Sequence, residues 1–241
     1  MTTPLVIWRV TDGKPGHDRQ SLGLARALAA ATGTECHDLA SGSPGAAVAI
    51  AFAGRRDLDQ LPAPDLILGA GHATHAWLLA AGRRYGGRTI VLMKPSLPHG
   101  WFSLCLVPRH DRVPPADNII ETTGALNPVR PGAARDGALA VVLIGGPSRH
   151  HCWDTGALAR ELAAVMAASA AERWLGSGSR RTPDEVGAAL RALGIDFHAA
   201  DQLPGDWVDT QLAVAGEVWV SADSVSMIYE ALTGGGSVGI L

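Results

Sequence analysis

The sequence predicts an α/β protein built from two Rossmann-like units, each with a mostly parallel sheet. Short apolar runs alternate with helical patterns along nearly all of the 241 residues, as is typical of βαβ connections. Between residues 127 and 137 the chain is rich in proline, glycine and charge, and the periodicity stops. We therefore expect an N-terminal domain at residues 1–128, a linker at 129–137 and a C-terminal domain at 138–241. A ligand is expected in a cleft between the two domains, near the carboxyl ends of the strands.

The first half of the chain predicts strands that are separated by helices and glycine-containing turns. Leu5–Val10 is an apolar, β-branched first strand, and Leu22, Ala25 and Leu28 mark a helix that stops near Gly33. Further strands are expected at residues 47–52, 65–68, 89–93 and 104–107, with a helix after the turn at 69–74.

The second half repeats the alternation. Thr182 is the expected N-cap of a helix that has Pro183 at its first position, where the fixed φ of proline is favourable. The other expected elements are strands at 139–144, 172–175, 195–198 and 218–220, a helix at 155–168, and a closing helix and strand after residue 221.

The C-terminal segment has the features of an anion-binding turn that leads into a helix. Asp223 is the expected N-cap, and the glycines at 234–236 end the helix. Ser224 and Ser226 then lie in the first turn, where backbone N–H groups and the helix dipole favour an anion. Glu230, one turn further, could contact the hydroxyls of a ribose. The same pattern is also typical of an ordinary capped helix.

Four more glycine- or serine-rich turns connect a strand to a helix, at residues 11–17, 69–74, 145–151 and 177–183. Gly145 and Gly146 would let the backbone approach a phosphate, and Ser148 would add a hydroxyl. Arg180 and Arg181 could neutralise phosphate charge. Glycine turns also belong to any α/β fold, and the arginine pair equally fits a solvated surface turn.

His17, beside Lys14 and Gly16 in the first of these turns, is the candidate catalytic base, because histidine exchanges protons near neutral pH. A loop histidine held by backbone contacts is the alternative. The turn GAGHAT also resembles a dinucleotide fingerprint, with Thr74 in place of its third glycine. It is not in the first βα unit, and Lys94 ends the next strand where an acidic residue would bind the ribose.

Composition argues against several other classes of protein. The formal net charge is −3 and no run of Lys or Arg exceeds a pair, so no nucleic-acid partner is expected. Three scattered cysteines suit reduced thiols in the cytoplasm, which is the expected location. No apolar run approaches the ~20 residues of a membrane span, and the N-terminus does not read as a signal peptide. His72, His75, His150, His151 and Cys152 form no compact ligand set, so neither a metal nor another cofactor is expected.

The motifs together resemble a known family. They are, in order, WRVTDGKPGHDRQSLGLARAL, DLILGAGHATHAW, IVLMKPSLP, NIIETTGALNPV, VVLIGGPSRHHCWD, SGSRRTP and ADSVSMIYEAL. The chain resembles the bacterial relatives of the plant elongated-mitochondria protein, a mitochondrial fission family. The pattern is also similar to the two-domain glycosyltransferase-B architecture of enzymes that use nucleotide sugars.

This resemblance implies a nucleotide side and an acceptor side. The C-terminal domain would bind a nucleoside diphosphate or its sugar, and the loop from Gly13 to His17 would face the sugar and the acceptor. Two-domain glycosyltransferases continue beyond the last motif, so we expect a C-terminal part that is shortened. The implied diphosphate and ribose ligands are Gly145, Gly146, Ser148, Ser179, Arg180, Ser224, Ser226 and Glu230, with Arg181 beside them.

Three functions stay open on the sequence alone. The leading one is a glycosyltransferase-like protein that binds a nucleoside-diphosphate sugar. The second is a non-catalytic interaction module related to a fission factor, with a protein partner or a second copy docking on Trp101, Phe102 and Leu104. The third is a nucleoside-diphosphate-sugar epimerase that uses NAD.

Overall fold

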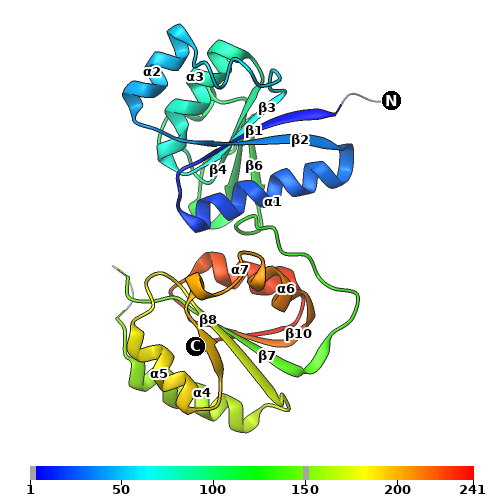
Figure 1. Ribbon diagram of the computed structural model, residues 1–241, viewed down its shortest axis with the longest axis vertical. Coiled ribbons are helices and arrows are strands. Elements are labelled where there is room, and N and C mark those ends of the chain that lie inside the picture. The colour runs from blue at the N-terminus through cyan, green and yellow to red at the C-terminus, as the bar shows by residue number, and fades with distance from the viewer. Residues whose placement is uncertain (1–3, 149–151) are drawn as a thin grey trace. The chain divides into compact units, whose positions relative to one another are not determined.

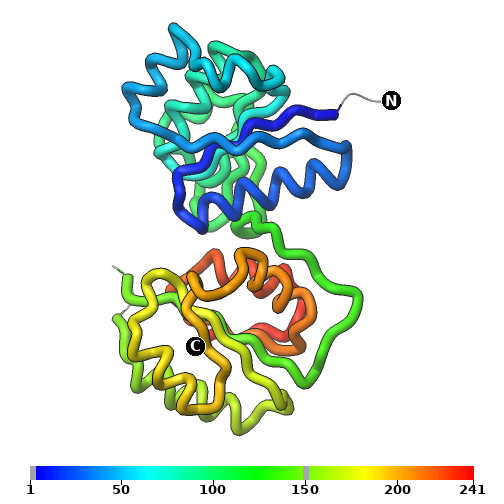
Figure 2. Tube along the Cα trace, in the orientation of Figure 1, coloured from blue at the N-terminus to red at the C-terminus, as the bar shows by residue number. Residues whose placement is uncertain are grey.

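The computed structural model describes residues 4–148 and 152–241, and the chain divides into two compact units (Figures 1 and 2). Unit 1 is Met1–Pro128 and unit 2 is Val129–Leu241. Each unit contains a parallel sheet with helices packed on both faces, so the predicted α/β class with parallel sheets is confirmed.

Unit 1 holds a six-stranded parallel sheet in the order β2–β1–β3–β4–β5–β6 among its described residues. Its strands are β1 (Leu5–Thr11), β2 (Thr34–Ala40), β3 (Leu66–Ala70), β4 (Arg88–Leu92), β5 (Leu104–Pro108) and β6 (Ile119–Thr122). Its helices are α1 (Pro15–Thr32), α2 (Pro44–Ala53) and α3 (His75–Tyr85), with the short turns η1 (His72–Thr74), η2 (His99–Trp101) and η3 (Arg109–Asp111).

Alternate residues of β1 build two cores, one on each face of the unit 1 sheet. Ile7 packs with Leu68 and with Ala25 of α1, while Trp8 packs with Trp77 in the cluster below α2 and α3. Because successive side chains of a strand point to opposite faces, an apolar run predicts a strand that is covered on both sides.

Two expectations for unit 1 are wrong, and two of its strands were not expected. Residues 47–52 form part of helix α2 and no strand, since Ser43 caps the helix by accepting from the Ala46 amide at 3.3 Å and Pro44 follows at the first position. A short apolar run fits a buried strand and a buried helix equally well. The strand of this region is β2, whose polar residues suit the sheet edge, and β6 at the opposite edge was also missed. The turn at 11–17 ends early, because α1 already begins at Pro15.

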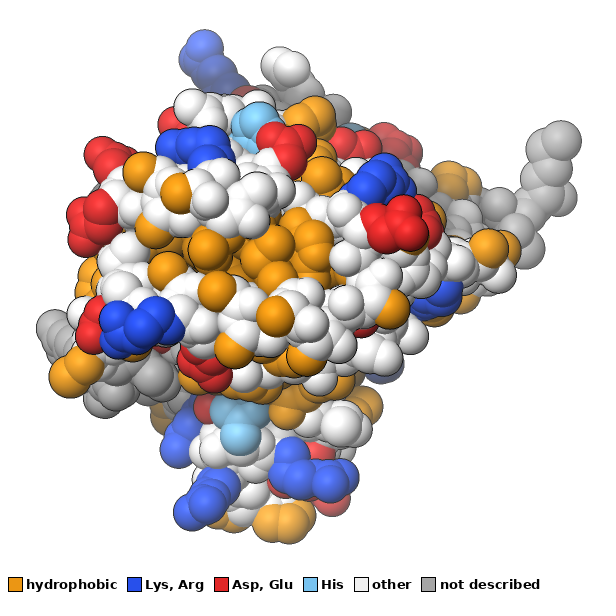
Figure 3. Space-filling model, turned by 90° about the horizontal axis from the view of Figure 1, so that it is seen from below, with side chains coloured by type: hydrophobic (Ala, Val, Ile, Leu, Met, Phe, Trp, Pro, Cys, Tyr) orange, Lys and Arg blue, Asp and Glu red, His pale blue; other side chains and the backbone are white. Residues whose placement is uncertain are grey.

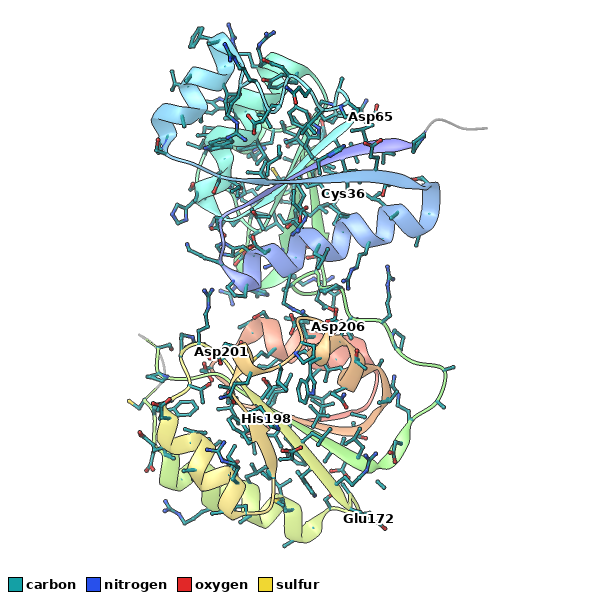
Figure 4. All side chains as sticks on the ribbon, viewed as in Figure 1. Cys36, Asp65, Glu172, His198, Asp201 and Asp206 are labelled. Atoms are coloured by element: carbon teal, nitrogen blue, oxygen red, sulfur yellow. The ribbon has the colours of Figure 1, made fainter. Side chains whose placement is uncertain are left out.

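Unit 2 holds a five-stranded parallel sheet in the order β11–β10–β7–β8–β9 among its described residues. Its strands are β7 (Asp136–Ile144), β8 (Arg173–Gly178), β9 (Asp196–His198), β10 (Ala215–Val220) and β11 (Ser237–Ile240). Its helices are α4 (Thr155–Ala168), α5 (Asp184–Ala192), α6 (Trp207–Val214) and α7 (Val225–Gly234), with the short turn η4 (Ala200–Gln202). Figure 4 labels Glu172, just before the amino end of β8, and Asp201, just after the carboxyl end of β9.

The central strand β7 separates two cores in the same way. Ala140 and Val142 pack with α4 and α5, and Val141 and Leu143 pack with α6 and α7. On the face of the sheet that α4 covers, an open groove of about 630 Å³ runs between α4 and the strands β10 and β11. A hollow floored by hydrophobic side chains is visible on this unit in Figure 3.

Several element ends in unit 2 differ from the expectations. Helix α7 has Ser224 at its N-cap position and α5 has Pro183, so Asp223 and Thr182 do not cap these helices. Both side chains instead bind neighbouring loops. Helix α6 was not predicted from the sequence. Gly235 ends α7 in the left-handed conformation with φ 85°, as the glycine stop predicted.

Both ends of the expected 129–137 linker belong to unit 2. Val129 is 2% exposed in the core below α6 and α7, and β7 starts at Asp136. The aromatic patch expected at 101–104 does not form as one surface, because Phe102 is 3% exposed while Trp101 is 60% exposed.

Candidate functional site

Each sheet has one point where the chain connections leave in opposite directions, and the predicted turns lie there. In unit 1 this switch point lies between β1 and β3, and in unit 2 it lies between β7 and β10. Open α/β sheets bind ligands in the crevice at the carboxyl ends of such strands. The topology of each unit therefore selects the turns after β1 and β3, and those after β7 and β10, as candidate sites.

In unit 2 the side chains after β10 bind the glycine turn after β7. The Gly145 amide donates to Ser221 Oγ at 2.7 Å, and the Gly146 amide donates to Asp223 Oδ2 at 3.0 Å. Ser221 Oγ in turn donates to Asp223 Oδ1 at 2.7 Å. The backbone donors that the sequence offers to a phosphate thus already point at a hydroxyl and a carboxylate.

Asp223 also joins the turn after β8, through Arg181. The Arg181 guanidinium donates to Asp223 Oδ2 at 2.7 Å and to the carbonyls of Gly146 at 2.8 Å and Pro147 at 3.1 Å. The side chain of Asp223 is 3% exposed and that of Arg181 is 44% exposed. Three donors therefore converge on one buried carboxylate. Such a position can hold an anion, and here the Asp223 side chain is the anion that occupies it.

Ser179 and Thr182 complete the connection between the turns after β7 and β8. Ser179 Oγ donates to the Gly145 carbonyl at 3.0 Å. Thr182 Oγ1 accepts from the Ser179 amide at 2.7 Å and contacts the carbonyls of Ile144 and Gly145. The predicted residues Gly145, Gly146, Ser179 and Arg181 therefore come together in one network.

The remaining predicted residues of unit 2 lie on α7 and on the rims of these turns. Ser224 Oγ and Ser226 Oγ are 3.4 Å apart at the start of α7, and no side chain caps this helix. Glu230 is 5% exposed on the same helix. Ser148 and Arg180 are exposed at the surface. His150 and His151 lie outside the residues that the structure describes.

In unit 1 the turn after β1 holds a histidine–carboxylate pair. His17 Nδ1 is 2.9 Å from Asp12 Oδ2, and the Lys14 amide donates to Asp12 Oδ1 at 3.1 Å. The side chain of Asp12 is 2% exposed and that of His17 is 19% exposed. Burial alone would raise the pKa of Asp12, but the hydrogen bonds from His17 and Lys14, with their charges, hold it below its ordinary 3.8. Asp12 is therefore ionised at neutral pH, and His17 Nδ1–H is the donor.

Gly71, in the turn after β3, makes room for this histidine. Gly71 has φ 82°, and a Cβ atom at this position would collide with the imidazole ring of His17. The glycine thus serves two purposes, the left-handed backbone and the close approach of His17. This packing links the turns after β1 and β3, which the sequence had shown only as separate motifs.

His75 is a second buried histidine at the start of α3. It is 2% exposed, its Nδ1 lies 3.1 Å from Ser96 Oγ, and its ring packs against Phe102. Burial, with a smaller effect from His72, lowers the pKa of His75 below 6.5. Within residues 4–148 and 152–241, no group of three His, Cys, Asp or Glu side chains could hold a metal ion.

The sequence reasoning missed Asp12, Ser221 and Asp223 as partners of the predicted residues. Asp12 and Asp223 each follow a predicted strand by a few residues, which is the position where side chains of a parallel sheet meet at one edge. That signal was available, but His17 lies 5 residues from Asp12, and Gly146 and Arg181 lie 77 and 42 residues from Asp223, so only the fold identifies these pairs.

Comparison with known families agrees with the motifs quoted above. A model of the family described as mitochondrial fission ELM1 matches residues 15–241. The chain belongs to the mitochondrial fission ELM1 family. No curated protein matches the sequence. The matched range includes the switch point of unit 2 and every predicted site residue except Gly13 and Lys14, whereas β1 and Asp12 of unit 1 precede it.

Solved structures that are similar to this ELM1-family chain include the following two. MurG of Acinetobacter baumannii aligns at 15% identity and TM-score 0.49 over 93% of this chain and 73% of its own. The lipopolysaccharide outer core galactosyltransferase WaaB, in its apo form, aligns at 11% identity and TM-score 0.45 over 98% of this chain and 80% of its own. At such identities and scores neither alignment transfers an activity.

Proposed function

We propose that this ELM1-family protein binds a nucleoside diphosphate or its sugar in unit 2 and acts as a glycosyltransferase-like protein. The observation that carries the proposal is the start of α7 at the β7–β10 switch point, where Ser224 and Ser226 place two hydroxyls beside first-turn amides that no side chain caps. A helix N-terminus with free amides at the carboxyl ends of parallel strands is typical of phosphate binding.

The diphosphate is proposed to bind beside Asp223, at the start of α7. Ser224 and Ser226 offer two hydroxyls and the first-turn amides of a helix that no side chain caps. Arg180, which is exposed on the turn after β8, would supply positive charge to the diphosphate. Arg181 and Asp223 then hold the turns in shape, and Glu230 is proposed for the ribose.

The catalytic group of the proposal is His17. With Nδ1 bound to the Asp12 carboxylate, Nε2 is the nitrogen that can accept a proton from an acceptor hydroxyl. Asp12 would fix the tautomer and stabilise the imidazolium that forms, as in other histidine–carboxylate pairs.

Nucleotide binding can be tested by thermal unfolding of the whole chain against UDP, GDP, ADP and CDP and their sugars. At a ligand concentration 100 times the Kd, one diphosphate should stabilise the protein by about 2.7 kcal/mol. The double variant Ser224→Ala/Ser226→Ala should lose that stabilisation. Ser237→Ala, an exposed serine of β11, is the matched control and should keep it.

Three outcomes would count against the proposal. Absence of stabilisation by every nucleotide at millimolar concentration would remove the binding function. Stabilisation that the Ser224/Ser226 variant retains would move the site away from α7. Stabilisation by NAD, with none by a diphosphate sugar, would favour the epimerase instead.

A further inference from the structure

Helix α2 carries an apolar face that the rest of unit 1 does not cover. The ten residues of α2 include no charged side chain. Ala47 and Ile50 are buried in the core, at 1% and 2% exposure. On the outward side, Val48 and Phe52 lie one helical turn apart and are 59% and 77% exposed. Two large apolar side chains on one outward helix face mark an interaction surface.

This outward face, which we call the α2 face (Gly45, Val48, Ala49 and Phe52), lies at the margin of the unit. Figure 1 shows α2 at the outer edge of unit 1, where it packs chiefly on α3. All four of its residues are exposed. The outer surface of this helix is convex, and its four residues offer no polar side chain to a partner.

A basic rim borders the α2 face. Two arginines follow α2 and two lie in the last turn of α3: Arg55, Arg56, Arg83 and Arg84. The Arg83 guanidinium lies 5.8 Å from the centroid of the Phe52 ring. Residues 44–59 and 83–85 contain two carboxylates, Asp57 and Asp59, and Asp57 accepts two hydrogen bonds of 2.7 Å from Arg55. The net positive charge of the rim is therefore carried by Arg56, Arg83 and Arg84.

We propose that the α2 face docks on a lipid surface with anionic headgroups. Val48 and Phe52 would enter the boundary between headgroups and acyl chains, while the arginines would contact the anionic headgroups. A convex apolar helix face without hydrogen-bonding side chains needs no shape-matched partner, and the lipids of a bilayer can rearrange around it. No helix among the described residues is long and apolar enough to cross a membrane, so this helix would lie on the surface.

Vesicle co-sedimentation of the full chain tests the proposal. The protein should bind phosphatidylcholine vesicles that contain phosphatidylglycerol, and bind less as salt is added, because screening weakens the arginine contacts. Val48→Ser/Phe52→Ser should weaken binding by roughly tenfold or more, since both apolar contacts are lost. Arg56→Gln/Arg83→Gln should weaken binding to the anionic vesicles while leaving any weak binding to pure phosphatidylcholine unchanged.

Trp101→Ser is the matched control, because Trp101 is a 60% exposed aromatic outside α2, and this variant should bind like the unchanged protein. Val48→Ser/Phe52→Ser and Trp101→Ser both change exposed side chains, so both variants should fold, as circular dichroism would show. The proposal is overturned if neither vesicle binds the protein, or if Trp101→Ser and not the α2 variant loses binding. It is equally overturned if the α2 variant only abolishes concentration-dependent self-association in sedimentation velocity, because the face would then contact a second copy.

Discussion

Two buried carboxylates, Asp12 and Asp223, hold the residues of the two candidate sites in place. Asp12 fixes His17, and Asp223 fixes Gly146 and Arg181. In both cases the carboxylate is almost fully buried and its oxygens are satisfied by several donors, which is how a protein keeps a charge inside at acceptable cost.

Replacement of Asp223 should separate its structural role from ligand binding. Asp223→Ala leaves the Gly146 amide and Arg181 without their acceptor and should lower the free energy of unfolding by about 2–4 kcal/mol. Asp223→Asn keeps an acceptor and the shape, so it should cost less. Urea denaturation measures both, and an equal cost for the two variants would contradict the assigned role.

The buried His75 should make the protein sensitive to mild acid. Its pKa is below 6.5 in the folded state, so the unfolded chain takes up the proton first as the pH falls. Stability should be fully present above pH 6.5 and decrease below it, by at most about 1.4 kcal/mol per pH unit from this one group.

His75→Asn, which can keep the contact with Ser96, should flatten this dependence. His110→Asn, at an exposed histidine, is the control and should leave the slope unchanged. Urea unfolding at a series of pH values between 5 and 7.5 gives the slopes, and identical slopes for all three proteins would show that His75 is not the responsible group.

At the scale of elements, the short turns decide the geometry of the candidate sites. The apolar runs predicted β1, β3, β4, β5 and β7, because most of their residues are buried, and the alternation of runs with helical patterns predicted α4. It failed for α2, where a helix and a buried strand have the same composition, and for β2 and β6, where edge positions allow polar residues.

The turn after β3 allows a direct test of this geometry. Gly71→Ala should push the His17 ring away from Asp12 and strain a backbone with φ 82°, at a cost of about 1–3 kcal/mol. Gly100→Ala has open space around the added methyl group and should cost little. Thermal unfolding gives the stability, and ¹⁵N spectra of His17 should show loss of the Nδ1–H tautomer in Gly71→Ala alone.

At the scale of the whole molecule, the sequence by itself determined the fold class, the two parallel sheets, most strands, and the family. These follow from periodic burial and from local turn chemistry, which are readable without knowing what lies nearby in space. The tertiary structure alone decided which turns meet. His17 meets Asp12 and Gly71, and Asp223 meets Gly146 and Arg181. Strand order sets these pairings, and strand order depends on contacts between residues tens of positions apart, which local periodicity does not record.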